Sequence, residues 1–168
     1  MASVLTLARC IGFGGSSGGS PSTNSFSSAV AVTSVDANVV AYTAGSTVVL
    51  MDVKSKQQLG FYRDESPGLP LGCLAFGGGT DVSSNMPMHL AAGEQGGAAS
   101  QVLVWSVSSG QVIARLKQHK HGVSSVCFSP DGKQLLSAGS SYDGQVCLWD
   151  YQKGVLLARA SAQAEIMA

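Results

Sequence analysis

Four short apolar runs joined by tight turns follow one another between residues 123 and 159, a spacing that leaves no room for long helices. The runs cover residues 123–128, 134–139, 145–150 and 155–159. In the first turn Pro130 fixes φ and Gly132 supplies a positive φ, while Asp143-Gly144 in the second is a strong hairpin dipeptide. The pattern predicts a four-stranded antiparallel sheet and an almost entirely β chain, with no helix of more than about two turns.

The same four-strand unit recurs twice earlier in a weaker form. One copy covers residues 71–76, 89–93, 101–105 and 111–116, and another covers residues 26–32, 39–45, 47–52 and 58–62. Met51, Trp105 and Trp149 then hold one equivalent position, at spacings of 54 (105 minus 51) and 44 (149 minus 105) residues. Since such a repeat takes about 40–45 residues, the longer interval predicts inserted loops within residues 64–70 and 77–88.

The segment 116–150, LKQHKHGVSSVCFSPDGKQLLSAGSSYDGQVCLWD, resembles a WD repeat. The resemblance implies an all-β fold, a WD-repeat β-propeller with about three four-stranded blades, which is a partial propeller. The expected organisation is an amino-terminal strand at 1–11 that closes a blade, a Gly/Ser-rich loop at 12–25, and three blades. These are a degenerate first blade at 26–63, a second blade with inserted loops at 64–118, and a third blade with the full signature at 119–168.

The WD-repeat resemblance also implies a buried relay of polar side chains in the last blade. In this relay Asp143 accepts from the imidazole of His119, which meets the hydroxyl of Ser137. That hydroxyl in turn meets the indole N–H of Trp149. Because each buried polar group satisfies the next, we expect a structural role and no chemistry.

Composition narrows the classes of partner. The chain of 168 residues is 45% hydrophobic and 12% charged, with 10 basic and 10 acidic residues, which suits a β-rich globular unit without a polyanion-binding surface. Lys117, His119, Lys120 and His121 form a locally basic cluster, but no aromatic stacking partners lie nearby, so we predict a solvated loop and no nucleic-acid partner. The apolar runs are far shorter than the ~20 residues of a membrane span, so no membrane partner is predicted.

The four cysteines, Cys10, Cys73, Cys127 and Cys147, are widely separated, and we predict free buried thiols in a reducing compartment. An alternative is a metal site made of His119, His121 and Cys127. The relay already assigns His119 a buried partner, so we predict neither a metal nor a cofactor.

The amino-terminal region leaves two alternatives open. Residues 4–8 have the pattern of a strand, whereas the first 35 residues are Ser-rich and contain no acid, as in an organelle transit peptide. In the Gly/Ser-rich loop at 12–25, Gly14-x-Ser16-x-Gly18 matches the sequence motif of a hydrolase nucleophile elbow. This gives a competing hypothesis, in which the chain is a hydrolase with Ser16 as nucleophile. The polar residues 21–24 follow where that motif needs a helix, so we predict no catalytic residue and a non-enzyme.

Most of the chain also resembles the amino-terminal propeller of the mitogen-activated protein kinase-binding protein family. The residues that carry this resemblance are Val39-Val-Ala-Tyr42, Ala44-Gly45 and Gln118-His-Lys-His-Gly-Val123. It implies a cytoplasmic or cytoskeletal scaffold that binds other proteins through the propeller surface, in kinase-cascade assembly or at centrosome and spindle microtubules. The alternative is a ciliary or other cytoskeletal structural protein. We further expect a fragment of a larger protein, which associates with downstream repeats or forms an oligomer because three blades leave two apolar faces open.

Overall fold

Twelve β-strands make up the regular structure of the described part of the chain. The computed structural model describes residues 30–32, 38–65, 68–80 and 87–161. The expected strand at 1–11, the loop at 12–25, Cys10 and Ser16 all lie outside these residues. Within them there is no helix, and therefore none that could cross a membrane.

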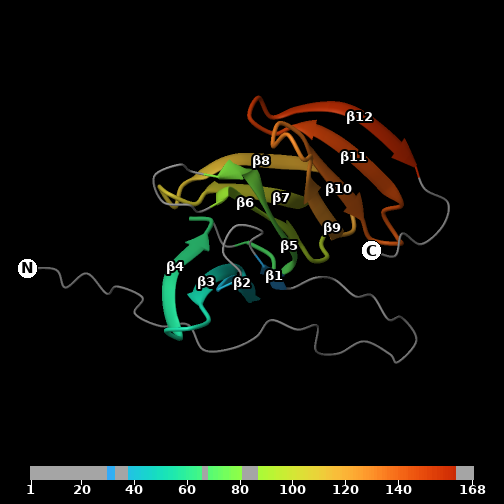
Figure 1. Cartoon of the computed structure of the whole chain (residues 1–168). Coiled ribbons are helices and arrows are strands. Elements are labelled where there is room, and N and C mark those ends of the chain that lie inside the picture. Colours follow the sequence, from blue (N-terminus) through green and yellow to red (C-terminus); the bar gives the residue numbers. More distant parts are fainter. Residues whose placement is uncertain (1–29, 33–37, 66–67, 81–86, 162–168) are drawn as a thin grey trace, which may run out of the picture.

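The strands form three antiparallel sheets of four strands each, and neighbours in each sheet are neighbours in sequence (Figure 1). The first sheet contains β1 (Val30–Val32), β2 (Val39–Ala44), β3 (Thr47–Asp52) and β4 (Gln57–Arg63). The second sheet contains β5 (Leu71–Thr80), β6 (Pro87–Glu94), β7 (Ser100–Ser106) and β8 (Val112–His119). The third sheet contains β9 (Val123–Phe128), β10 (Leu135–Gly139), β11 (Gln145–Asp150) and β12 (Val155–Ser161). The all-β architecture predicted from turn spacing is confirmed.

One predicted loop is different in the structure. Residues 77–80 continue β5 and residues 87–88 begin β6, with Gly77 paired to His89 and Thr80 paired to Pro87. The extra residues of the second repeat therefore lengthen a hairpin, because antiparallel pairing satisfies backbone groups that an open loop would leave to solvent.

Tight turns set the strand register. Gly132 (φ 68°) and Gly144 (φ 59°) adopt the left-handed conformation that their turns require. The register then places Leu135 opposite both Phe128 and Trp149. One side of β9, β10 and β11 thus faces the interior, whereas β12 is exposed apart from the half-buried Leu156.

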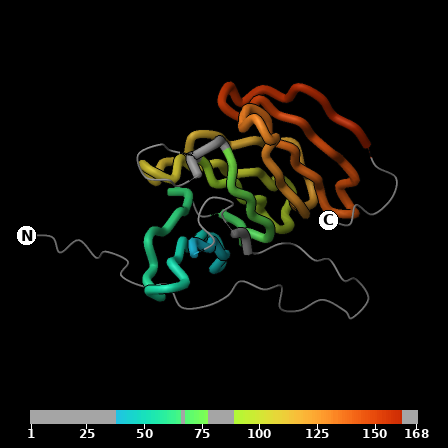
Figure 2. The backbone as a smooth tube through the Cα atoms, viewed as in Figure 1, coloured from blue at the N-terminus to red at the C-terminus, as the bar shows by residue number. Residues whose placement is uncertain are grey.

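The three sheets pack face to face in chain order, as the colour sequence along the tube in Figure 2 shows. The interface between the first and second sheets contains Val39, Ala41, Val48, Leu50, Tyr62, Leu71, Leu74, Leu90, Ala92, Leu103 and Trp105. The interface between the second and third sheets contains Cys73, Ala91, Val102, Val104, Ala114, Leu116, Val123, Val126, Leu135, Cys147, Trp149 and Tyr151. Each pair of neighbouring sheets therefore has its own apolar core.

Glycines allow the second and third sheets to approach closely. A Cβ on Gly93 of β6 would stand 2.6 Å from the Val123 Cβ and 2.6 Å from the Cys73 Sγ. A Cβ on Gly77 of β5 would stand 2.1 Å from the Phe128 ring. The absence of a side chain at these two positions sets the distance between the sheets.

Candidate functional site

The structure brings together the four side chains of the predicted relay. The Trp149 Nε1–H donates to the Ser137 Oγ at 2.9 Å, and the Ser137 Oγ lies 2.8 Å from the His119 Nε2. The His119 Nδ1 lies 2.6 Å from the Asp143 Oδ2. The other carboxylate oxygen of Asp143 accepts the backbone N–H of Lys120 at 2.7 Å. All four side chains thus form one connected network.

The donors and acceptors of this network run in one direction. The indole can only donate, so the Ser137 hydroxyl accepts from Trp149 and has its own proton free for the His119 Nε2. The His119 Nδ1–H then faces the Asp143 carboxylate. A neutral imidazole with its proton on Nδ1 therefore satisfies every member of the chain.

The relay joins two sheets. His119 is the last residue of β8 and pairs with Ser100 in the second sheet. Its imidazole nevertheless binds Ser137 of β10 and Asp143 of the β10–β11 turn, both in the third sheet. The network thus connects the end of one sheet to the turn of the next.

Ser137, His119 and Asp143 lie in the order of a Ser-His-Asp catalytic triad, but their burial argues against that chemistry. Ser137 is 1% exposed and His119 is 2% exposed, and the serine oxygen already accepts the indole N–H. A nucleophile has to reach a substrate carbonyl at about 3 Å, with donors placed for the oxyanion. The network leaves no such approach to Ser137.

In the second sheet, a buried glutamate that the sequence analysis did not single out binds backbone groups of two segments. Glu94, at the end of β6, is 3% exposed. One of its oxygens accepts the backbone N–H of Gln101 at 3.0 Å, and the other accepts from the backbone N–H of Leu69 and the side-chain amide of Gln101, each at 3.3 Å. Glu94 therefore joins the segment before the first strand of the second sheet to the start of its third strand, while Asp143 joins the corresponding segments of the third sheet. The missed signal was an acid at the end of an otherwise apolar strand.

The equivalent positions Trp105 and Met51 do not repeat the relay. The indole of Trp105 faces the first sheet and donates to the backbone carbonyl of Arg63 at 3.4 Å. In the first sheet, the amide of Gln58 donates to the Tyr42 hydroxyl at 2.9 Å. The three sheets thus share a fold while their polar contacts differ.

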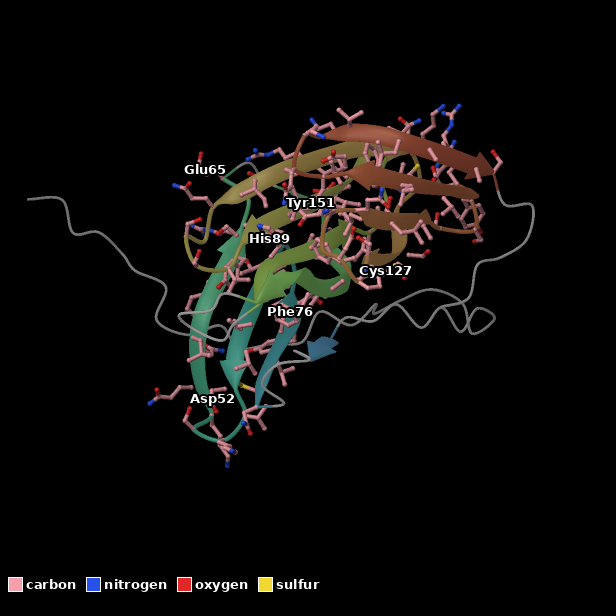
Figure 3. All side chains as sticks on the ribbon, turned by 45° about the horizontal axis from the view of Figure 1, so that its top comes forward. Asp52, Glu65, Phe76, His89, Cys127 and Tyr151 are labelled. Atoms are coloured by element: carbon pink, nitrogen blue, oxygen red, sulfur yellow. The ribbon has the colours of Figure 1, made fainter. Side chains whose placement is uncertain are left out.

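A second polar contact between sheets lies at the far end of β11. The Tyr151 hydroxyl donates to the backbone carbonyl of Gly132 at 2.6 Å and lies 3.0 Å from the His89 Nδ1. The rings of His89 and Tyr151, both labelled in Figure 3, meet edge to face with their centroids 5.5 Å apart. Burial lowers the pKa of His89.

The cysteines and histidines do not assemble into the alternative metal site. Both ring nitrogens of His119 are engaged by Asp143 and Ser137. Cys73 and Cys147 are free and buried, and burial raises the pKa of the Cys73 thiol to about 12. Cys127 is exposed, so the prediction that it is buried is wrong, because its side of β9 faces away from the second sheet.

Four loops lie together at the relay end of the second and third sheets. The backbone N–H of Gln95 donates to the backbone carbonyl of Pro70, and the backbone N–H of Ser140 donates to the backbone carbonyl of Gly122. A Cβ on Gly122 would stand 2.8 Å from the Gly96 nitrogen. We call residues 68–70, 95–99, 120–122 and 140–144 the relay-end surface.

Comparison with known proteins agrees with this geometry. Residues 110–150 match the family described as WD domain, G-beta repeat. The solved structure of U3-55K superposes with a TM-score of 0.64 at 21% sequence identity, over 81% of this chain and 39% of that one. The three sheets together with these matches define a partial WD-repeat β-propeller.

Two curated relatives are longer proteins from Chlamydomonas reinhardtii. Cilia- and flagella-associated protein 52 is 30% identical over 156 residues, which are 92% of this chain and 22% of the relative. Centriole proteome protein 16 is 41% identical over 59 residues, which are 35% of this chain and 3% of the relative. The chain thus spans about a fifth of the first relative and a small part of the second. These similarities do not show the resemblance to the mitogen-activated protein kinase-binding protein family.

Proposed function

We propose that the chain is a non-catalytic protein-interaction scaffold in a ciliary or other microtubule-based structure. The observation that carries the proposal is the stack of three WD-type sheets, related in sequence to a protein named for cilia and flagella. A second relative is named for the centriole. Kinase-cascade assembly, which the sequence resemblance implied, has no comparable observation in its favour.

The relay supports the non-catalytic part of this proposal. Its hydroxyl, imidazole and carboxylate satisfy one another inside the protein, and we propose that they hold the loops of the relay-end surface in place. Glu94 performs the equivalent task for the second sheet. The network would then fix a surface for partners without reacting with them.

The relay-end surface is the part of the chain best suited to a protein partner. Tyr142, in its segment 140–144, is 88% exposed, which is unusual for a large aromatic side chain. Tyrosine is enriched at interfaces because it buries a large area with few rotatable bonds. Lys120 and His121 beside it are also exposed and supply polar contacts for the rim.

Retention in cilia tests the proposal. A tagged chain expressed in a ciliated cell should remain with the axonemes after detergent extraction, and Tyr142→Ala should release at least about half of it, as expected when an interface anchor worth more than about 1 kcal/mol is removed. Lys153→Ala is the matched control, because Lys153 is exposed in the turn at the opposite end of β11. Complete extraction of the wild-type chain, or equal release of both variants, would contradict the proposal.

A further inference from the structure

The fourth strand of each sheet carries the same irregularity. In the second sheet the pairing of β7 with β8 shifts between Val104 and Trp105, so Ile113 of β8 has no partner on β7. Leu59 of β4 and Leu157 of β12 are left out of the pairing in the same way. Each is a β-bulge, in which the extra residue is unpaired and the strand bends. The bulges therefore place one aliphatic residue at an equivalent point on all three strands.

These three aliphatic side chains are exposed at the outside of the molecule. Leu59 is 51% exposed, Ile113 is 40% exposed and Leu157 is 49% exposed. The first strands of the sheets pack together, with β5 against β1 and β9, and the fourth strands lie at the outer edges (Figure 1). The second sheet has the first and third sheets on its two faces. The exposure of Ile113 is therefore not a consequence of a missing neighbouring sheet.

The fourth strands also carry positive charge. Arg63 lies in β4, Arg115 and Lys117 lie in β8, and Arg159 lies in β12, and all four are exposed. None of the three strands contains an acidic residue. Arg115 forms an ion pair with Asp64 at 2.7 Å, whereas Arg63, Lys117 and Arg159 form no ion pair within the described part of the chain. This charge favours a partner that supplies carboxylates.

The most complete set of these features is on β8. Ile113, Arg115 and Lys117 are exposed at alternate positions, whereas Ala114 and Leu116 between them are buried against the third sheet. The three exposed side chains therefore share one side of the strand. In the described residues no strand pairs with the outer edge of β8. The backbone N–H and C=O groups on that edge are available to an extended segment.

We propose that β8 is a docking site for an extended acidic segment of a partner protein, which pairs with the outer edge of the strand. The segment places an aliphatic side chain against Ile113 and carboxylates near Arg115 and Lys117. Side chains opposite one another on neighbouring strands contact directly, and both apolar pairs and pairs of opposite charge stabilise a sheet. This site is distinct from the relay-end surface, and the proposal does not depend on the role proposed for that surface.

The synthetic peptide Glu-Thr-Glu-Thr-Leu-Thr-Glu-Thr-Glu tests the proposal on the full 168-residue chain. It has carboxylates at alternate positions around a central leucine, so it matches β8 in either direction. Fluorescence anisotropy of the labelled peptide should show saturable binding. The same peptide with lysine in place of each glutamate should not bind. No binding of the acidic peptide, or equal binding of the two peptides, would overturn the proposal.

Substitutions test whether the side chains of β8 hold the peptide. Lys117→Glu should weaken binding at least about fivefold, because it replaces an attraction by a repulsion. Lys133→Glu makes the same change of charge at an exposed lysine in the β9–β10 turn and should leave binding unchanged. Ile113→Ser should weaken binding at least about threefold, with Val53→Ser in the exposed turn after β3 as its control. Equal effects within either pair would contradict docking on β8.

Hydrogen exchange and one further variant locate the bound peptide. The peptide should slow exchange of backbone amides in residues 112–118, because strand pairing gives the outer N–H groups acceptors, and should leave the turn at 129–134 unchanged. Tyr142→Ala should bind the peptide as the wild type does, since Tyr142 belongs to the relay-end surface. No slowing in β8, or a loss of binding in Tyr142→Ala as large as that in Lys117→Glu, would overturn the proposal without bearing on retention in cilia.

Discussion

The imidazole of His119 belongs by strand pairing to the second sheet and by hydrogen bonding to the third, because its Nδ1 lies 2.6 Å from the carboxylate of Asp143. Both side chains are almost completely shielded from solvent. The third sheet is therefore attached to the second by a satisfied polar contact at the loop end as well as by an apolar core. We propose that the relay helps to fix how the two sheets fit together.

Removing the imidazole should destabilise the fold. We expect His119→Ala to lower the free energy of unfolding by about 1–3 kcal/mol, since it removes the imidazole partner of the buried Asp143 Oδ2 and of the Ser137 hydroxyl, which keep only their contacts with the Lys120 N–H and the Trp149 indole. His121→Ala should change it by less than about 0.5 kcal/mol, because His121 is exposed and its side chain lies outside the relay. Urea unfolding at one fixed protein concentration measures both. Equal losses for the two variants would mean that the relay does not stabilise the fold.

Glu94→Gln should destabilise the fold although glutamine has nearly the same shape as glutamate. The amide has one oxygen in place of two, so its NH₂ group would face either the Gln101 or the Leu69 backbone N–H. We expect a loss of about 1–3 kcal/mol in the free energy of unfolding. Glu65→Gln serves as the control because Glu65 is exposed. Urea unfolding measures both variants. An unchanged free energy of unfolding in Glu94→Gln would show that the Glu94 carboxylate does not stabilise the fold.

The elements of the fold could be predicted from sequence because they depend on local signals. Turn residues such as Gly132 and Gly144 mark the hairpins, and short apolar runs mark the strands between them. The exposure of Cys127 could not be predicted, because it depends on which side of β9 meets the second sheet. Glu94 was missed for a related reason, since its backbone partners at 69 and 101 come together only in the folded chain.

Acid should weaken the contact between His89 and Tyr151. Burial lowers the pKa of His89 below its usual 6.5, so the unfolded chain binds a proton at a pH where the folded chain does not. The stability from this group is fully present above about pH 6.5 and is lost as the pH falls from there towards the lowered value. His89→Gln should flatten the pH dependence of the urea midpoint between pH 7.5 and 5. An unchanged slope in His89→Gln would contradict the assignment to this residue.

The second and third sheets approach each other closely at Gly93, so a larger residue at this position should disturb their packing. Gly93→Ala should lower the free energy of unfolding by about 1–3 kcal/mol, since the new methyl group would collide with Val123 and Cys73. In a Val123→Ala background the same substitution should cost less, because one of the two colliding groups is smaller. A double-mutant cycle by thermal or urea unfolding measures this difference. Strict additivity would show that the sheets do not meet at this point.

The most direct test of the central claim, that the relay is structural and non-catalytic, is labelling of the native chain with a fluorophosphonate, which reacts with activated serines. The burial of Ser137 and its hydrogen bond from Trp149 predict no adduct at Ser137 in the folded protein. The same account predicts that Ser137→Ala costs about 1–3 kcal/mol in the free energy of unfolding. A stoichiometric adduct at Ser137 that is lost in His119→Ala would contradict the account and identify the relay as a working triad.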